Sequence, residues 1–539
     1  MGETDDDLIL NPTERRLVGH VERGEWLDLV GDQPVDEPAM RSWDDSHTVR
    51  AVVIREIVLG RLAANPDPHG VQLRGARIEG RLDLENIISS VAIKLRDCLL
   101  PAGVTARGAT LHVLHLAGCH LAHSTVSALD ANMLNVPTLV LMGATVTASC
   151  DAGAVNLLGA HIGELDCDGA HLSNDSGPAL YADNLHVEHG VTLMGGFTAI
   201  ASTASYSTVS LLHADVAFLS CDGAKLHNDS GPTLVGDGLH AKQGVFLRGG
   251  FESSASSEIG GIRLLGAHLG HLECDGARLS NDSGPALYAD GLHVDQHVLI
   301  RHGFEAVGSG SYAVLDLSHT EIGGGLIFDP ERLEHSTDPH ARLQLDGLTY
   351  AGLPVGISTN EWLNLLREGT PKYSAQPYQH LAAAHRVAGH DSQARRILIA
   401  QRRDQVRRRA LTGRSARIWA RLTGLTLGYG YQPWRALLGL LAAIVTAVIL
   451  AINLGNHGGL VQTRTPPRPT PTGCTVVEQV GVGLDLAAPL INTGARARCD
   501  TTDSVTGQVL TATSWALRLL AWAFATLFVA GFTGAVRKT

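Results

Sequence analysis

The sequence predicts a mainly β fold, a right-handed β-helix or solenoid, with helices at both ends and two membrane-spanning helices after it. The stretch Cys-Asp-Gly-Ala-x-Leu-x-Asn-Asp-Ser-Gly-Pro begins at Cys167, Cys221 and Cys274, with spacings of 54 and 53 residues. A repeat of this length is typical of stacked coils. Glycine is abundant at 60 residues, as tight turns between strands require. Two uncharged apolar runs near the C-terminus predict the membrane helices.

Residues 1–70 are predicted to form a helical cap. Asn11-Pro12-Thr13-Glu14 is a typical helix start, with a cap residue, a first-turn proline and a glutamate at the third helical position, and the helix is expected to reach Arg23. A second helix is expected from about Asp45, because four apolar residues follow at helical spacing: Val49, Val52, Val53 and Ile57. These helices would cover the open strand edge of the first coil.

Residues 71–355 are assigned to the solenoid. Ile162, Cys167 and Leu172 lie five residues apart, and a small or apolar residue precedes each by two positions. This spacing resembles the pentapeptide-repeat pattern, in which such residues face the interior of a β-helix. The five-residue phase weakens at Asn174–Pro178 and stops at Gly195-Gly196-Phe197. Each repeat of 53 or 54 residues is therefore expected to form about two coils and a loop.

Two features of the repeat are candidate sites. Cys167, Cys221 and Cys274 occupy an inward position, where burial is expected to leave the thiols unreactive. The Asn-Asp-Ser-Gly-Pro segments offer oxygen atoms to a cation, but a turn explains them better. In such a turn the Asn side chain bonds the backbone, Gly takes a positive φ and Pro fixes the exit. These segments begin at Asn174, Asn228 and Asn281.

Histidine is also abundant, at 26 residues. His161 and His171 are expected to point outward, because each precedes an inward residue. No His-x-x-x-His pair with a nearby acidic ligand stands out, so a solvated face is favoured over a metal site. No P-loop, Gly-x-Ser-x-Gly or Cys-x-x-Cys motif occurs. We therefore predict no metal or cofactor and assign no catalytic residue.

The charges divide the chain into an acidic body and a basic collar. Residues 71–350 contain 31 Asp and Glu against 14 Lys and Arg, whereas residues 361–435 contain 4 against 14. Residues 356–433 are predicted to form a basic helical hairpin, with its turn at Gly389-His390-Asp391, and a juxtamembrane collar. The collar is expected to touch anionic lipid rather than nucleic acid, because no nucleic-acid recognition module is present. Its arginines are Arg402, Arg403, Arg407, Arg408, Arg409, Arg414, Arg417 and Arg421.

Residues 434–455 and 515–536 are predicted to be the membrane helices, the alternative being two buried helices of a soluble domain. The positive flanks predict a two-pass protein of the inner (cytoplasmic) membrane with both termini cytoplasmic. The intervening loop, residues 456–514, would be extracytoplasmic. The extracytoplasmic part of the chain would extend from about residue 455 to about residue 518. Its two cysteines, Cys474 and Cys499, are expected to form a disulfide there, the alternative being two free thiols.

The order of these motifs resembles a bacterial family commonly named membrane-associated oxidoreductase. The resemblance covers nearly the whole chain and is carried by five segments: Thr13–Leu17, Gly24–Asp28, Thr48–Ala51, Gly75–Leu84 and Tyr378–Arg403. It implies a redox enzyme with a bound chromophore. A pocket for that group would lie at the Gly-Gly-Phe loops near Phe197, Phe251 and Phe304.

We expect a membrane-anchored cytoplasmic scaffold or protein-interaction module, because a solenoid offers a long regular surface. Its partners would be membrane lipid and a protein on the solenoid face, with no nucleic acid. Two alternatives remain. One is the oxidoreductase that the resemblance implies. The other is an acidic β-helix that mimics DNA, which the net charge of −17 over residues 71–350 permits.

Overall fold

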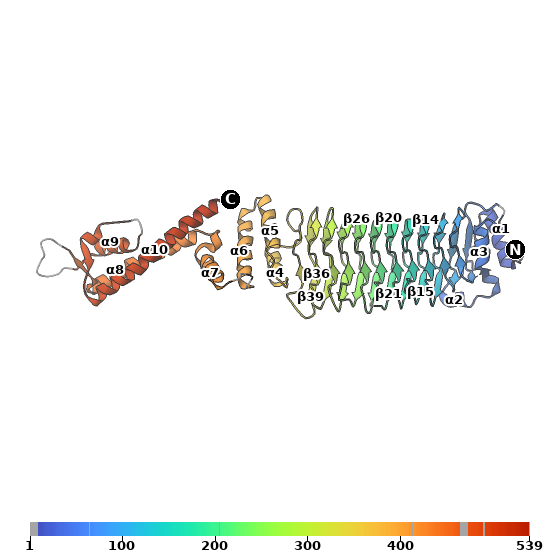
Figure 1. Cartoon of the computed structure of the whole chain (residues 1–539), viewed down its shortest axis with the longest axis horizontal. Coiled ribbons are helices and arrows are strands. Elements are labelled where there is room, and N and C mark those ends of the chain that lie inside the picture. The colour runs from blue at the N-terminus through green and yellow to red at the C-terminus, as the bar shows by residue number, and fades with distance from the viewer. Residues whose placement is uncertain are drawn as a thin grey trace. The chain divides into compact units, whose positions relative to one another are not determined.

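The computed structural model describes residues 9–63, 65–203, 205–408, 410, 413–463, 473–488 and 491–537. These residues form two compact units, Met1–His390 and Asp391–Thr539. The first unit is a parallel β-solenoid with helices before and after it (Figure 1). The second unit is mainly helical. The predicted fold class is confirmed, with two helices long and apolar enough to cross a membrane.

Three parallel sheets run along the solenoid, and the described residues of the third sheet supply one strand to each of eleven coils. Sheet A contains β1 (Leu27–Asp28), β3 (Val71–Arg74), β6 (Ile88–Ser89), β7 (Ile93–Arg96), β10 (Thr110–Leu111), β11 (Leu114–His115), β14 (Asn135–Val140), β17 (His161–Asp166), β20 (His186–Thr192), β23 (Asp215–Ser220), β26 (His240–Phe246), β29 (His268–Leu269), β30 (Leu272–Glu273), β33 (His293–Val294), β34 (Val298–Ile300), β37 (Glu321–Ile322) and β38 (Leu326–Phe328). Sheet B contains β2 (Thr48–Arg50), β4 (Arg77–Glu79), β8 (Leu99–Leu100), β12 (His120–His123), β15 (Thr145–Ala148), β18 (His171–Asn174), β21 (Thr198–Ala201), β24 (Lys225–Asn228), β27 (Glu252–Ala255), β31 (Arg278–Asn281), β35 (Glu305–Gly308) and β39 (Arg332–His335). Sheet C contains β5 (Leu82–Asp83), β9 (Val104–Thr105), β13 (Leu129–Asp130), β16 (Val155–Asn156), β19 (Leu180–Tyr181), β22 (Val209–Ser210), β25 (Leu234–Val235), β28 (Ile262–Arg263), β32 (Leu287–Tyr288), β36 (Leu315–Asp316) and β40 (Leu343–Gln344).

The core is built from columns of aliphatic side chains, one residue per coil. Successive side chains of a strand point to opposite faces, so one position of each short strand faces inward and the next faces solvent. The inward column of sheet C is fully buried and contains only Leu, Val and Ile: Leu82, Val104, Leu129, Val155, Leu180, Val209, Leu234, Ile262, Leu287, Leu315 and Leu343. Each coil thus buries its apolar side chains against its neighbours.

The pairing of coils explains the long repeat. In sheet C, Val155 is the register partner of Leu180, and Leu180 is in turn the partner of Val209. Two coils therefore advance the chain by the same distance in sequence as that from Cys167 to Cys221. A shorter coil and a longer coil alternate in this region, and the two together make one repeat unit.

The pentapeptide resemblance is not confirmed, because the coils differ in length. The register partners Leu82 and Val104 are closer in sequence than the partners Leu180 and Val209. A uniform five-residue winding would instead give every coil the same length.

Of the two predicted N-terminal helices, the first forms as expected and the second begins later than expected. Helix α1 (Pro12–Arg23) has the predicted capping box, and the buried Glu14 carboxylate also pairs with the Arg50 guanidinium at 2.6 Å. The second predicted helix is wrong at its start. The 3-10 turn η1 (Asp45–His47) leads into strand β2, and helix α3 (Ala51–Val58) begins only afterwards. Pairing of β2 with β4 satisfies the backbone at the solenoid edge and overrides the local helical pattern. A short helix α2 (Glu37–Arg41) was not predicted.

Two helices follow the last coil in the first unit. Helix α4 (Thr359–Glu368) begins with a capping box formed by Ser358 and Glu361. Its Trp362 is buried, and the indole meets the ring of Phe328 edge-on at 5.4 Å between centroids. Helix α5 (Gln376–Val387) follows, and its His380 ring lies 4.5 Å from the ring of Tyr350. These contacts seal the C-terminal end of the solenoid core.

The described residues of the second unit form the helices α6 (Asp391–Arg407), α7 (Arg414–Leu427), α8 (Trp434–Leu454), α9 (Val476–Ala487) and α10 (Val505–Arg537). The turns η2 (Gly428–Gly430), η3 (Gly455–Gly459) and η4 (Ala495–Ala497) and the antiparallel pair β41 (Leu460–Gln462) and β42 (Cys499–Thr501) complete it. Helix α10 starts before the predicted second span, because its less apolar first turns pack beside the β41–β42 segment.

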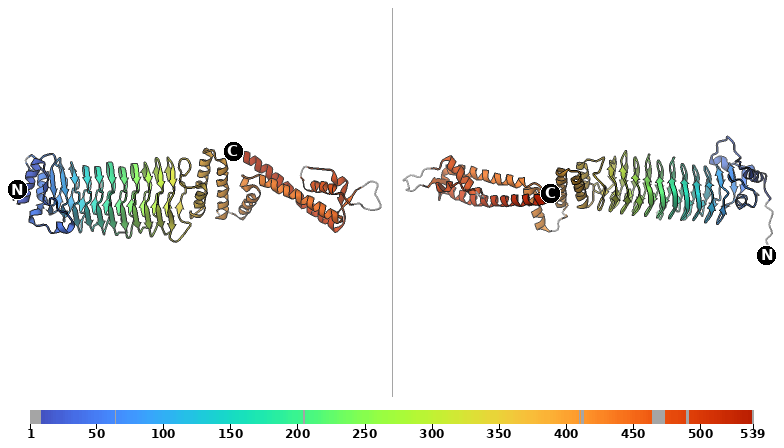
Figure 2. Two further views of the ribbon diagram at one scale, coloured as in Figure 1. Left: turned by 180° about the vertical axis from the view of Figure 1, so that it is seen from behind. Right: turned by 90° about the horizontal axis from the view of Figure 1, so that it is seen from above.

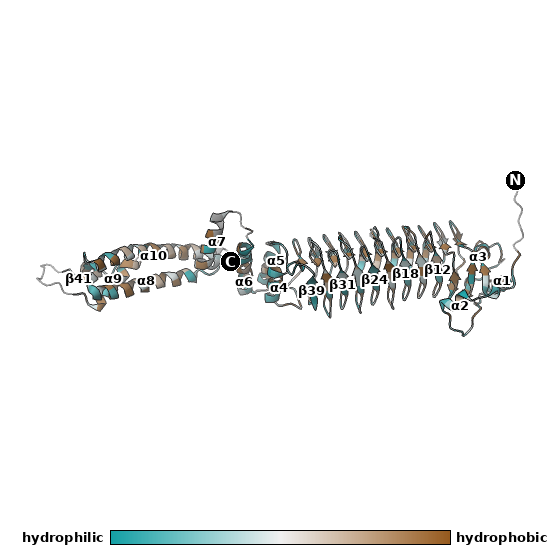
Figure 3. Ribbon diagram, turned by 90° about the horizontal axis from the view of Figure 1, so that it is seen from below, coloured by the Kyte–Doolittle hydropathy of each residue, from teal (hydrophilic) through white to brown (hydrophobic). Residues whose placement is uncertain are grey.

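Helices α8 and α10 run side by side (Figure 2). The buried residues of α8 are small and recur every seven or four positions: Ala436, Ala443, Ala447 and Ala451. Gly439 lies on the same stripe, and a Cβ there would lie 2.6 Å from the Phe524 ring of α10. Small residues let two helix backbones approach closely, as is usual for helices packed in a membrane. Hydrophobic residues are distributed along both helices (Figure 3).

Candidate functional site

The predicted inward cysteines are buried and chemically quiet. Cys167, Cys221 and Cys274 have no exposed surface. Backbone hydrogen bonds show that Leu193 and Leu247 occupy the same column in the intervening coils, so the thiols alternate with leucines and cannot touch one another. Burial raises the pKa of each thiol, to about 12 for Cys274. A thiol reacts as its thiolate, and a raised pKa keeps these thiols protonated at neutral pH. The column therefore contributes to packing.

The Asn-Asp-Ser-Gly-Pro segments are turns held by buried asparagines. The Asn281 amide donates to the carbonyls of Ser257 at 2.8 Å and Pro285 at 2.7 Å, and its Oδ1 accepts from the Ser257 N–H at 2.9 Å. Asn174 makes the same three contacts to Cys150 and Pro178. The Asn228 amide donates to the carbonyls of Tyr206 and Pro232, and its Oδ1 accepts from N–H groups of its own turn. The amides are therefore engaged with the backbone.

One detail of the turn prediction is wrong. The glycines of these segments, Gly177, Gly231 and Gly284, do not have positive φ. A Cβ at Gly284 would instead collide with the Ser257 carbonyl oxygen of the preceding coil. The motif requires glycine because two backbones meet there.

The Gly-Gly-Phe loops do not build a pocket from their aromatic rings. Phe197, Phe251 and Phe304 are fully buried inside the coils. The rings fill the core at a corner of the coil, where the two preceding residues have positive φ. These are two glycines before Phe197 and Phe251, and His302 and Gly303 before Phe304. The rings themselves are therefore closed to a ligand, and the chromophore pocket that the resemblance implies at these loops stays a prediction.

The most ordered polar feature of the solenoid is a column of imidazoles and carboxylates on the outer face of sheet A. Parallel pairing places one such residue on each of seven successive coils. We call this column the histidine ladder: His161, His186, Asp215, His240, His268, His293 and Glu321. Neighbouring coils lie about 4.8 Å apart, so the side chains meet. The rings of His268 and His293 have centroids 4.6 Å apart.

Carboxylates connect the imidazoles of the histidine ladder. The Asp215 carboxylate lies 3.3 Å from His186 Nδ1 and 3.2 Å from His240 Nδ1, and Lys242 Nζ lies 3.5 Å from it. Hydrogen bonding by the His240 side chain and the charges of Lys242 and the two histidines lower the pKa of Asp215, against the opposing effect of burial. The ladder is therefore a chain of polar contacts held at fixed spacing by the strands.

The local geometry that builds the histidine ladder is repeated in each coil. A residue with positive φ stands two positions before every ladder residue: Gly159, Asn184, His213, Gly238, Gly266, Gly291 and His319. It turns the chain into the strand, so the following Ala, Leu or Thr packs inward and the ladder residue points outward. Sequence reasoning placed His161 outward but missed the ladder. The recurring Gly-Ala-His and Gly-Leu-His triplets were the signal that could have found it.

A second surface feature is a shallow groove of about 560 Å³ on the outer face of sheet B. Lys225, Glu252 and Arg278 alternate in charge along one column, and Glu252 lies 3.0 Å from Lys225 and 3.4 Å from Arg278. The parallel column runs from Ile200 through His227, Ser254 and Ser280 to Val307. The short serines lower the surface between His227 and Val307. We call these residues the sheet B groove: Ile200, Lys225, Glu252, Ser254, Arg278 and Val307.

The predicted basic collar divides between α6 and α7. Arg402, Arg403 and Arg407 are exposed on α6, whereas Arg408 pairs with the buried Asp404 at 3.2 Å. Arg421 is exposed on α7. Arg409 and the side chains of Arg414 and Arg417 lie outside the described residues. Exposed apolar residues share α7 with these arginines: Ile418, Trp419, Leu422 and Leu425.

The segment between α8 and α10 has a small core of its own. A disulfide joins Cys474 and Cys499, whose Cα atoms are 6.2 Å apart. Leu460, Val482, Leu486 and Leu510 are buried around Cys499. Helix α9 packs closely on α8, since a Cβ at Gly483 would lie 2.6 Å from the Val448 Cα. The segment is therefore a compact structure rather than the simple loop that the sequence suggested.

Comparison of the chain with protein-family models, with curated proteins and with solved structures finds no match.

Proposed function

We propose that this protein is a membrane-anchored scaffold whose solenoid binds a partner protein. The observation that carries the proposal is the combination, in one chain, of an eleven-coil solenoid and two helices long and apolar enough to cross a membrane. A solenoid buries its core between neighbouring coils, so its outer faces remain available along its length. The chain would hold this surface at the membrane.

The surfaces of α8 and α10 support membrane insertion. Only 17% and 11% of the residues in their most apolar windows are buried. Leu437, Leu441, Val445 and Ile449 of α8 are each about half exposed. Apolar surface of this extent favours lipid over water.

Helix α7 supports a particular orientation. It precedes α8, and it combines arginines with exposed Trp419 and Leu425, as helices in the membrane interface do. The positive residue Arg537 also ends α10. Positive flanks favour the cytoplasmic side, so we propose that both termini are cytoplasmic at the inner membrane. The disulfide between Cys474 and Cys499 fits an oxidising compartment on the other side.

The sheet B groove is the surface that we propose for the partner protein. Protein interfaces combine an apolar centre with a polar rim. Ile200 and Val307 supply apolar contacts, and the alternating charges of Lys225, Glu252 and Arg278 form the rim. Because these ion pairs are exposed, they contribute little to stability. They are available to select a partner with charges of both signs.

Cysteine labelling in intact cells tests the orientation. The six free cysteines are buried and the other two form the disulfide, so the natural chain offers no exposed thiol in its described residues. We expect Asp503→Cys, an exposed position before α10, to react with a membrane-impermeant maleimide in intact cells. Asp151→Cys, exposed on the solenoid, should react only after permeabilisation. Labelling of Asp151→Cys in intact cells would contradict the proposed orientation.

Photo-crosslinking tests the partner surface. We expect a crosslinkable amino acid at Ser254, in the sheet B groove, to yield one discrete partner adduct in membranes. The matched control is Thr147, which is exposed in the same column four coils earlier. The double variant Lys225→Glu, Arg278→Glu should lower the adduct yield at Ser254 at least fivefold by reversing the rim charges. Equal adducts at both positions, or no effect of the charge reversal, would refute this surface.

A further inference from the structure

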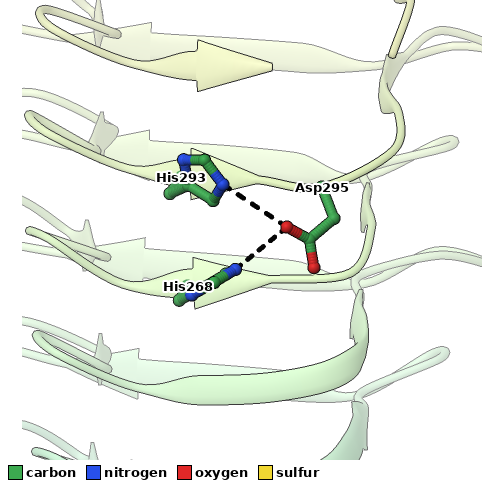
Figure 4. A group of neighbouring side chains, drawn as sticks. All are labelled: His268, His293 and Asp295. Carbon is green, nitrogen blue, oxygen red and sulfur yellow. Dashed lines mark hydrogen bonds and ion pairs between the residues drawn. The ribbon is translucent and has the colours of Figure 1, made fainter. Parts of the chain in front are cut away.

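Two imidazoles of the histidine ladder converge on a carboxylate beside it, in a way that the rest of the ladder does not repeat. His268 and His293 are register partners on β29 and β33, and Asp295 follows β33 directly. Figure 4 shows both rings turned toward the same carboxylate oxygen. His268 Nε2 lies 3.0 Å from Asp295 Oδ1, and His293 Nε2 lies 3.3 Å from it.

The two nitrogen–oxygen distances are close to the edge length of a metal tetrahedron. Zinc binds imidazole nitrogen at about 2.0–2.1 Å and carboxylate oxygen at about 2.0–2.2 Å, which places two ligand atoms of a tetrahedral site about 3.3 Å apart. One nitrogen from each imidazole and one carboxylate oxygen lie mutually within 4.8 Å. We propose that His268, His293 and Asp295 bind a divalent transition-metal ion such as Zn²⁺, a site that is independent of the scaffold function.

The surroundings hold these side chains in place. The strands fix the coil spacing, and the Asp295 N–H donates to the Leu269 carbonyl at 2.9 Å. Glu321, on the next coil, places Oε2 3.5 Å from His293 Nδ1. A carboxylate on the second ring nitrogen is the usual outer partner of a metal-binding histidine, because it orients the ring and raises its basicity. The site is thus supported before any metal binds.

The chemistry favours a transition metal over calcium or magnesium. Imidazole is a ligand for zinc, copper, nickel and iron, whereas Ca²⁺ and Mg²⁺ prefer oxygen. About half of each side chain is exposed, which leaves room for water or an outer ligand at the fourth position.

The other part of the histidine ladder provides a natural comparison. His186, Asp215 and His240 contain the same residue types, but the two imidazoles face different carboxylate oxygens. Lys242 Nζ also lies 3.5 Å from Asp215 and would repel a divalent cation. Among the described residues, only the His268, His293 and Asp295 cluster meets the geometric requirement for a metal ligand set.

Zinc binding to the full-length protein tests the proposal. The chain is purified in detergent without a polyhistidine tag, freed of metal with a chelator and titrated with Zn²⁺ by calorimetry, with metal analysis after equilibrium dialysis. We expect one zinc ion per chain. His293→Ala and Asp295→Asn should each weaken binding at least about tenfold. His186→Ala, which removes an imidazole from the same ladder, should leave the affinity within twofold.

Cobalt supplies a second readout that a purely structural role would not alter. Co²⁺ bound at a site of low symmetry should give absorption bands in the visible spectrum. The His293→Ala variant should lack these bands. Because the three side chains are about half exposed and lie outside the core, the variants are expected to keep the strand signal of the natural chain. Zinc affinity that is unchanged in both His293→Ala and Asp295→Asn, or the absence of zinc binding by the natural chain, would overturn the proposal.

Discussion

Asn281→Asp is expected to destabilise the solenoid by about 3–5 kcal/mol, the range for an uncompensated buried charge. The natural amide donates to two carbonyl oxygens, of Ser257 and Pro285, and its side chain is almost completely buried. A carboxylate cannot donate, so both carbonyl oxygens would lose the hydrogen bond from the amide and face a negative charge. The strand transition of the full-length chain in detergent, followed by far-ultraviolet circular dichroism during denaturation, measures the loss.

The matched control for this variant is Asn184→Asp. Asn184 is exposed in the left-handed region at φ 53°, a conformation that Asn and Asp both tolerate. The control should change stability by less than about 0.5 kcal/mol, as exposed substitutions usually do. Because a protonated acid can donate one hydrogen bond, the deficit of Asn281→Asp should shrink as the pH falls. Equal stabilities of the two variants would show that the buried amide does not hold the turn.

The fold was predictable because its signals are local and repeated. The repeat at Cys167, Cys221 and Cys274 indicated the solenoid, and the capping box at Asn11 and Glu14 indicated the first helix. The capping box acts over a few residues and the repeat is visible by comparing segments of the sequence, so neither signal requires knowledge of distant contacts. Strand β2 was missed for the opposite reason. Its residues follow a helical pattern, and only the partner strand β4, which lies beyond helix α3 in the sequence, draws them into a sheet.

The histidine ladder was not predictable from a fixed period. The sequence distances between successive members, from His186 through Asp215, His240 and His268 to His293, alternate between longer and shorter steps. The steps alternate because loops of different length are inserted at the coil corners. A search for one repeat distance therefore misses the column, although the strands stack its members directly. The metal cluster depends further on Asp295, which lies outside the ladder position.

The segment between the apolar helices shows another limit of local reasoning. The sequence favoured a loop, yet α9 has its own capping box, formed by Thr475 and Glu478. Its glycines at positions 481 and 483 lower helix propensity, which hid the helix. Close packing of Gly483 on Val448 explains why glycine is present there. Tertiary contact, which a single sequence does not display, compensates for the weak local preference.

Trp362→Ala is expected to cost about 3–5 kcal/mol, the range for truncating a fully buried tryptophan. The indole is 1% exposed and meets the rings of Phe328 and Tyr350 edge-on, at 5.4 Å and 6.4 Å between centroids. Its removal would leave a cavity where α4 covers the last coils. The thermal midpoint of the strand transition in the full-length chain measures the effect.

The association state of Trp362→Ala distinguishes two roles of the indole: protecting the open end of the solenoid, or only filling its core. Solenoids need covered ends, because an open coil offers an unpaired strand edge to other chains. We therefore expect Trp362→Ala to form concentration-dependent oligomers, detected by light scattering below the thermal midpoint. Trp362→Phe, which keeps a ring against Phe328, should be as monodisperse as the natural chain. Trp26→Ala is a second control, because the Trp26 residue is 41% exposed, and it should also remain monodisperse. If Trp362→Ala loses stability without associating, the indole fills the core but does not protect the edge, and α5 would then be the element that closes the solenoid.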